Sequence, residues 1–279
     1  MVSSSSDRPF LAAMASLALM YLLLILLMLG ADAWYGFTKV SGSQLLGIFQ
    51  QENVQHSILL TLFTCTVTAI LSVIVAVPTG YLLSRYKFPG KLFVDAILDM
   101  PIVLPPLVVG LSLLLLFNRF PSEGSSFEDL LNKIGIKVTF NVLGIILAQF
   151  AVACAFSVRT MRNTFDQISP RTEQVALTLG CNRAGAFFRV VIPEAWRGIS
   201  TAGTLAWTRA MGEFGPILVF AGAIPRKTEV LSSTVYLEIA TGSLETAVIV
   251  SLMMVTIAVV VLVAVRVWDR GSQGGLYHD

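Results

Sequence analysis

The sequence is poor in the residues that catalysis, metal binding and disulfide formation require. Its 279 residues include only three cysteines (Cys65, Cys154 and Cys181) and two histidines (His56 and His278), and their spacing fits neither a disulfide framework nor a metal site. The glycine-rich patterns G-x-x-x-x-G-K-[ST] and G-x-G-x-x-G are absent, so no known phosphate loop is present. We therefore expect no catalytic residues, no cofactor, no metal and no nucleic-acid partner.

Charge is also scarce, because only 13% of the residues are charged and 55% are hydrophobic, with a mean hydropathy of +0.78. About twenty apolar residues in a helix cross the ~30 Å hydrocarbon core of a bilayer. Lipid offers no partners to backbone polar groups, which favours helices. We predict an all-α polytopic membrane protein, a single transmembrane domain over residues 1–279. Its six predicted spans cover residues 10–30, 57–84, 92–117, 140–159, 199–221 and 247–268.

The basic residues predict the orientation of these spans. Twelve Lys and Arg residues lie on one side of the predicted membrane and six on the other, and the loop between spans 4 and 5 holds six of the twelve. Basic loops stay in the cytoplasm, so this loop and both termini are expected there. An alternative for the first segment is a secretory signal, with Ala31-Asp32-Ala33 as its cleavage site. Its hydrophobic run of about twenty residues is longer than the usual 7–15, which favours an uncleaved span.

The basic loop contains the signals of a short helix. Ser169 is a predicted N-cap, Pro170 suits the first helical position, and Glu173 lies near the positive end of the helix dipole. Gly180 is a predicted stop. Such a helix of about ten residues is too short to be stable alone in water, so it must pack against something. The apolar residues available for this packing are Val175, Ala176 and Leu179.

The string Glu173-x-x-Ala176-x-x-x-Gly180, followed thirteen residues later by Pro193, resembles the cytoplasmic loop of ABC importer permeases. In that family the short helix docks into a cleft of the ATPase subunit and transmits its closure. The resemblance assigns Glu173, Val175, Ala176, Leu179, Gly180 and Pro193 to an ATPase-coupling loop. The family often has Ala where this chain has Val175. The alternative is a generic amphipathic loop.

Prolines interrupt the third predicted span at Pro101, Pro105 and Pro106. Each removes a backbone donor and clashes with the preceding turn, so the helix must kink or unwind. Freed carbonyls at membrane depth are tolerated only against protein or a watery cavity, which predicts that this segment lines an internal passage. A purely structural kink is the alternative. With Leu104 and Gly110, the segment resembles the P-x-x-L-P-P-x-x-x-G stretch of molybdate- and sulfate-type permeases, where it helps to form the central passage.

Span 5 contains two opposite charges, Arg209 and Glu213, four residues apart and therefore able to pair on one helix face. Charged residues at membrane depth usually face a bundle interior or an aqueous path. Gly215-Pro216 is expected to break the helix just beyond the acid. The segment resembles the A-R-A-x-G-E-F-G stretch of oxyanion permeases, which implies that Arg209, Glu213, Phe214 and Gly215 border the passage and its gate. A structural pair that only holds spans together is the alternative.

Two further acids, Asp95 and Asp99, lie at the predicted cytoplasmic start of span 3. Arg85, Lys87 and Lys91 precede them closely. We expect an ion-pair cluster at the membrane interface, with a role in transport as the alternative.

The family resemblance covers about residues 57–268 and implies the membrane-spanning permease of an ABC importer in the plasma (inner) membrane. It implies an ABC ATPase subunit in two copies, an extracytoplasmic substrate-binding protein, and a second permease copy in a homodimer. The implied substrate is a tetrahedral oxyanion, molybdate or tungstate ahead of sulfate or thiosulfate. A secondary transporter is disfavoured because Glu213 has a partner and no internal repeat is evident. A membrane enzyme would need clustered reactive side chains.

Overall fold

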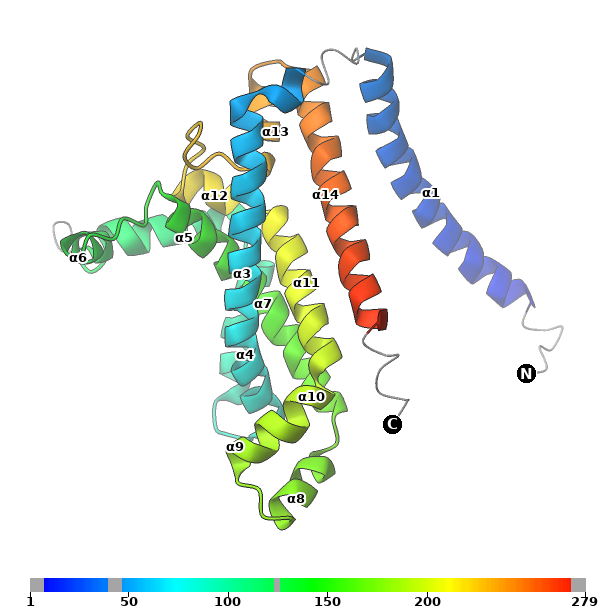
Figure 1. Cartoon of the computed structure of the whole chain (residues 1–279), viewed down its shortest axis with the longest axis vertical. Coiled ribbons are helices and arrows are strands. Elements are labelled where there is room, and N and C mark those ends of the chain that lie inside the picture. The colour runs from blue at the N-terminus through cyan, green and yellow to red at the C-terminus, as the bar shows by residue number, and fades with distance from the viewer. Residues whose placement is uncertain (1–7, 40–46, 123–125, 272–279) are drawn as a thin grey trace.

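The computed structural model describes residues 8–39, 47–122 and 126–271, and within these ranges it contains helices and no strands (Figure 1). The prediction of an all-α chain is confirmed. The helices are α1 (Arg8–Lys39), α3 (Glu52–Arg85), α4 (Lys91–Val103), α5 (Pro106–Arg119), α6 (Phe127–Lys133), α7 (Val142–Gln167), α8 (Pro170–Thr178), α9 (Arg183–Ala186), a π-helical turn (Phe187–Val191), α10 (Ile192–Glu194), α11 (Trp196–Met211), α12 (Gly215–Phe220), α13 (Leu231–Ala240) and α14 (Leu244–Gly271).

Four of these helices, α1, α3, α7 and α14, are long and apolar enough to cross a membrane. The third predicted span is two helices, α4 and α5, which are bent by 111° and bring the count to five if they are taken as one span. The fifth predicted span is also divided, into α11 and the short α12. The count of six therefore stays a prediction, whereas the interruptions that the sequence predicts in these two spans are present.

The centre of the molecule is formed by α3, α7 and α11, which lie side by side (Figure 1). The face of α3 that is buried carries small hydroxyl residues, and small residues let membrane helices approach closely. These residues are Ser57, Thr61, Thr64, Thr68 and Ser72. At Gly80 the contact with α7 is so close that an added Cβ would lie 2.8 Å from the backbone nitrogen of Arg162.

One buried side chain, Gln149 of α7, joins all three central helices. Its Oε1 accepts a hydrogen bond from Thr68 of α3 at 3.1 Å, and its Nε2 donates to the carbonyl of Ala210 in α11 at 3.1 Å. An amide left without partners in an apolar interior would cost several kcal/mol. Gln149 therefore specifies the register of the three helices.

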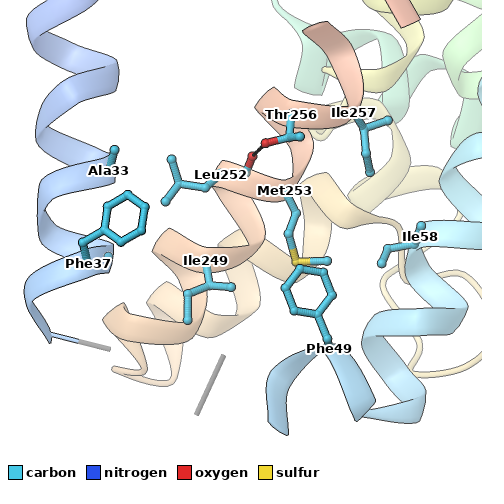
Figure 2. Close-up of a pocket in the computed structure, with 10 residues that line it drawn as sticks. Ala33, Phe37, Phe49, Ile58, Ile249, Leu252, Met253, Thr256 and Ile257 are labelled. Atoms are coloured by element: carbon cyan, nitrogen blue, oxygen red, sulfur yellow. Dashed lines mark hydrogen bonds between the residues drawn. The ribbon is translucent and has the colours of Figure 1, made fainter. Parts of the chain in front are cut away.

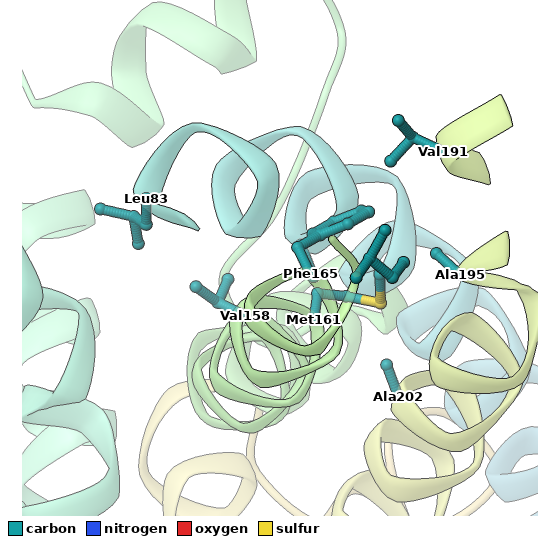
Figure 3. Close-up of a cluster of buried hydrophobic side chains, with 9 residues drawn as sticks. Leu83, Val158, Met161, Phe165, Val191, Ala195 and Ala202 are labelled. Carbon is teal, nitrogen blue, oxygen red and sulfur yellow. The ribbon is translucent and has the colours of Figure 1, made fainter. Parts of the chain in front are cut away.

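At the end of the bundle next to α8, a cluster of buried apolar side chains joins α3, α7, the π-helical turn and α11 (Figure 3). We call it the loop-proximal core. Met161 and Phe165 of α7 are fully buried at its centre, with Val191 and Ala195 contributed by the loop. The loop between α7 and α11 is thus packed onto the bundle through its second half.

The first helix, α1, stands apart from this bundle (Figure 1) and approaches α14 near Gly36, where an added Cβ would lie 3.2 Å from Leu252 Cδ1. An apolar cavity of about 300 Å³ separates α1, α14 and the start of α3 (Figure 2). No residue in the most apolar stretch of α1 is buried against the rest of the described structure. Ala31-Asp32-Ala33 lies inside this helix, and the uncleaved first span stays a prediction.

Candidate functional site

The two interrupted spans meet at one cavity of about 340 Å³. The break between α4 and α5 supplies one wall and the break between α11 and α12 supplies the other. The lining residues are Pro105, Pro106, Leu107, Arg209, Gly212, Glu213, Phe214 and Gly215. All but one of the residues predicted to border a passage therefore lie together. The exception is Pro101, which lies inside α4 and does not line the cavity.

The break between α4 and α5 follows from its prolines. Leu104 ends α4 in an extended conformation (φ −66°, ψ 139°), as expected of a residue before proline. Pro105 is also extended (ψ 134°), and Pro106 occupies the first turn of α5, where its missing N–H costs nothing. The predicted interruption of this span is confirmed.

Glycines allow α5 and α12 to touch backbone to backbone beside the cavity. A Cβ at Gly110 would lie 2.8 Å from Pro216 Cα, a distance that real Cβ atoms essentially never show. A Cβ at Gly215 would lie 3.2 Å from Pro106 Cβ. The two glycines thus hold the broken ends of the two spans against each other.

The predicted ion pair forms, with Arg209 Nη2 at 2.8 Å from Glu213 Oε1. Only 1% of the Glu213 side chain is exposed, against 31% for Arg209, whose guanidinium carbon lies 5.6 Å from the centre of the Phe156 ring. The expected position of the helix break is wrong. α11 ends at Met211, before the acid, and Gly215 begins α12. Proline at the second position of α12 suits a helix start, which is why Gly215-Pro216 opens a helix here.

Other elements hold this segment in ways that the local sequence did not indicate. Ser232 of α13 donates a hydrogen bond to the carbonyl of Glu213 at 2.7 Å. The Tyr236 ring lies 4.7 Å from that of Phe214, between centroids. These residues, and Phe156 under Arg209, come from distant parts of the chain, and no pattern within a few residues marks them.

The loop helix α8 has the predicted caps. Ser169 Oγ accepts a hydrogen bond from the Arg171 amide at 3.3 Å, and Pro170 begins the helix. Gly180 has φ +92°, a conformation that favours glycine. The Gly180 amide donates to the Leu177 carbonyl and the Cys181 amide to that of Ala176, both at 3.1 Å, which is the Schellman pattern of a helix end.

The three apolar residues of α8 do not form one face. Ala176 is buried against the body of the chain, whereas 56% of Val175 and 80% of Leu179 are exposed. Pro193 is exposed in α10. Val175 and Leu179 therefore project from the loop with nothing covering them in the described part of the chain.

The Glu173 side chain points back to α3. The Tyr81 hydroxyl donates to its Oε1 at 2.5 Å, and Arg85 Nε lies 3.6 Å from its Oε2. Tyr81 and Arg85 precede Glu173 by about ninety residues, and sequence reasoning did not find them.

The expected ion-pair cluster at the start of α4 is present, with partners other than those expected. Asp95 Oδ1 lies 2.8 Å from Arg162 Nη1, and Asp99 Oδ2 lies 3.9 Å from Arg159 Nη2, so both pair with α7. Arg85 instead faces Glu173. Nowhere in the described ranges do three potential ligands gather to hold a metal ion.

Comparison with known families agrees with this architecture. The model of the family described as the binding-protein-dependent transport system inner membrane component matches residues 72–273. The chain belongs to this family. The matched segment contains both the cavity and the α8 loop, and the permease is thus a multi-pass inner-membrane protein of the ABC importer class.

Its relatives include oxyanion permeases. The permease is 32% identical over 238 residues to the sulfate transport system permease protein CysT of Escherichia coli (strain K12), covering 85% of this chain and 84% of that one. It is 34% identical to the molybdenum transport system permease protein ModB of the same strain, covering 65% and 78% of the two chains. It is 36% identical to the molybdate/tungstate transport system permease protein WtpB of Pyrococcus furiosus, covering 64% of each. The permease is therefore a member of the oxyanion branch.

Among solved structures, a crystal structure of a bacterial ABC transporter involved in the import of the acidic polysaccharide alginate has the same fold. The TM-score is 0.72 at 17% identity, over 95% of this chain and 96% of that one. At this identity the likeness concerns the fold alone.

Proposed function

We propose that the permease passes a tetrahedral oxyanion inward through a passage that includes the cavity between Pro105 and Arg209. The observation that carries the proposal is the meeting of the two interrupted spans at one charged cavity, in a chain whose relatives are sulfate, molybdate and tungstate permeases. Irregular backbone at membrane depth lines cavities rather than lipid, which supports a passage here.

The ion pair suits brief contact with an anion. Arg209 is the one basic residue of the predicted spans away from their ends, and 31% of its side chain is exposed. Glu213 already occupies its guanidinium at 2.8 Å, so an arriving oxyanion must compete with a resident carboxylate. Such competition weakens binding, and a route that must release its solute needs weak binding. We propose that the pair acts at the gate of the passage.

The choice among oxyanions is open to test. The sequence favoured molybdate or tungstate, whereas the sulfate relative covers 85% of this chain and the molybdate and tungstate relatives cover 65% and 64%. The shared chemistry is a tetrahedral divalent oxyanion. Both sulfate and molybdate are therefore the probes of choice.

We propose that a separate ABC ATPase drives transport and docks on α8. Val175 and Leu179 are exposed on this loop, and apolar side chains in water favour burial by a partner. The excess of basic residues on this side supports a cytoplasmic loop and cytoplasmic termini.

A second copy of the permease would close the passage, and an extracytoplasmic binding protein would deliver the solute. One structure of the alginate transporter is a complex with a pentasaccharide-bound periplasmic protein, which supports the last partner.

The test is uptake of radiolabelled sulfate and molybdate by cells that express the permease with the proteins of neighbouring genes. We expect uptake of one anion, and we expect it to vanish when the ATPase is omitted or carries a substitution in its phosphate loop. Uptake that persists without any ATPase would contradict the proposal and favour a secondary transporter. Uptake of neither anion would contradict the proposed substrate class.

A further inference from the structure

The carboxylate of Glu173 is held by α3 through both of its oxygens. The Tyr81 hydroxyl lies 2.5 Å from Oε1, and Arg85 Nε lies 3.6 Å from Oε2. Only 14% of the Glu173 side chain and 10% of that of Arg85 are exposed. The same guanidinium donates through Nη2 to the carbonyl of Ile168, just before α8, at 2.9 Å. Arg85 thus joins α3 to the loop at two points.

The position of the Tyr81 hydroxyl is set by packing. The Tyr81 ring makes edge contacts with Phe187 of the π-helical turn, at 4.7 Å between centroids, and with Phe165 of α7, at 5.6 Å. It also packs against the loop-proximal core. A ring held on two sides presents its hydroxyl in one place, so little entropy is lost when it binds the carboxylate.

α8 has few other attachments. It is nine residues long, and Ala176 is its one buried residue. A side-chain hydrogen bond from Thr172 to Glu194, at 3.4 Å, joins it to the rest of the loop. A helix this short gains little stability from its own backbone. Its position therefore depends strongly on Glu173.

α3 leads from this contact to α11, the helix that carries Arg209. It is a single helix from Glu52 to Arg85, and Thr68 reaches the Ala210 carbonyl through Gln149, one residue from Arg209. Pro78 lies inside α3 between Tyr81 and Thr68, and the helix continues through it. A continuous helix that is joined to α8 at one end and, through Gln149, to α11 near its middle can carry displacement from one to the other.

We propose that Tyr81 and Arg85 are positioning residues that tether α8 to α3 through Glu173, so that ATPase closure moves α3 together with α8. The coupling part of this inference rests on the proposed function, whereas the tether itself does not.

The tether is tested first in the purified permease in lipid nanodiscs, without any partner. Tyr81→Phe removes the donating hydroxyl and keeps the ring. We expect the amides of residues 171–179 to exchange hydrogen about tenfold faster, the factor that corresponds to loss of a hydrogen bond to a charged group. Glu173→Gln should give a similar change, and the double variant little more than either single one. Tyr21→Phe, at an exposed position of α1, is the matched control. Unchanged exchange in both single variants would overturn the tether.

The coupling role is tested in the complete transporter, by the ratio of solute imported to ATP hydrolysed. In Tyr81→Phe we expect this ratio to fall several-fold, with co-purification of the ATPase unchanged, because Val175 and Leu179 remain in place. A role of Tyr81 in docking predicts the opposite, namely loss of the ATPase in Tyr81→Phe. That loss, or an unchanged ratio despite faster exchange, would overturn the inference. If the wild-type permease binds no ATPase, the proposed function fails, and the exchange experiment still decides the tether.

Discussion

Replacing Arg209 alone should harm the permease more than replacing Arg209 and Glu213 together. The Glu213 side chain is 1% exposed, and its Oε1 forms an ion pair with Arg209 Nη2 at 2.8 Å. Arg209→Ala leaves this carboxylate buried without a counter-charge, whereas the double change to alanine removes both charges. Removing one partner of a buried pair typically costs about 3–5 kcal/mol. Because 31% of Arg209 is exposed, we expect about 3 kcal/mol, the lower end of this range.

The assay is the apparent melting temperature of the purified variants, together with uptake in cells. Arg209→Ala should melt about 5 °C or more below the wild type. The double variant should recover a substantial part of this loss. A matched control is Arg226→Ala, since Arg226 pairs with Glu52 at 2.5 Å but 63% and 75% of these side chains are exposed. An exposed pair contributes about 0–1 kcal/mol, so this variant should melt close to the wild type.

The reasoning would be refuted if the double variant lost at least as much stability as the two single changes added together. Independent effects mean that the two side chains do not interact. A gating role makes a separate claim, namely that the double variant folds but transports with altered anion dependence. Normal uptake by a stable double variant would leave the pair a structural contact only.

Three further changes test the site and the loop. Leu179→Asp should abolish co-purification with the ATPase while the permease still inserts, because it places a charge on the exposed apolar side of α8; retained ATPase would contradict docking there. Gly110→Ala should lower the melting temperature by several degrees, because its Cβ would lie 2.8 Å from Pro216, whereas Gly47→Ala, with no atom within 4 Å, should not. Pro105→Ala should alter the rate of uptake, because it removes a proline that keeps α4 and α5 apart as separate helices. An unchanged rate would mean that this break has a structural role only.

Local features of the sequence predicted local features of the fold. Ser169 and Gly180 bound α8 as expected, because a cap or a stop acts through hydrogen bonds within a few residues. Pro105 and Pro106 interrupt the third span for the same reason. The Arg209–Glu213 pair formed even though α11 ends between its members, because residues four apart remain near each other at a helix end.

Predictions that depended on the direction in which a side chain points failed more often. Val175, Ala176 and Leu179 were expected to pack together, and instead Ala176 turns inward while Val175 and Leu179 turn outward. Asp95 and Asp99 were expected to meet the basic residues just before them and instead meet α7. In each case several partners of suitable chemistry were available to the side chain. The packing of the helices determined which partner it contacts.

The sequence by itself determined that the permease is a helical membrane protein, that its third and fifth predicted spans are interrupted, and that the interrupted segments contain prolines and an ion pair. Each of these follows from composition or from interactions that span a few residues. The tertiary structure decided that the two interruptions form one cavity and that Glu173 binds Tyr81, 92 residues away along the chain. No local rule reaches so far, because the encounter of these residues depends on how α3, α7 and α11 pack.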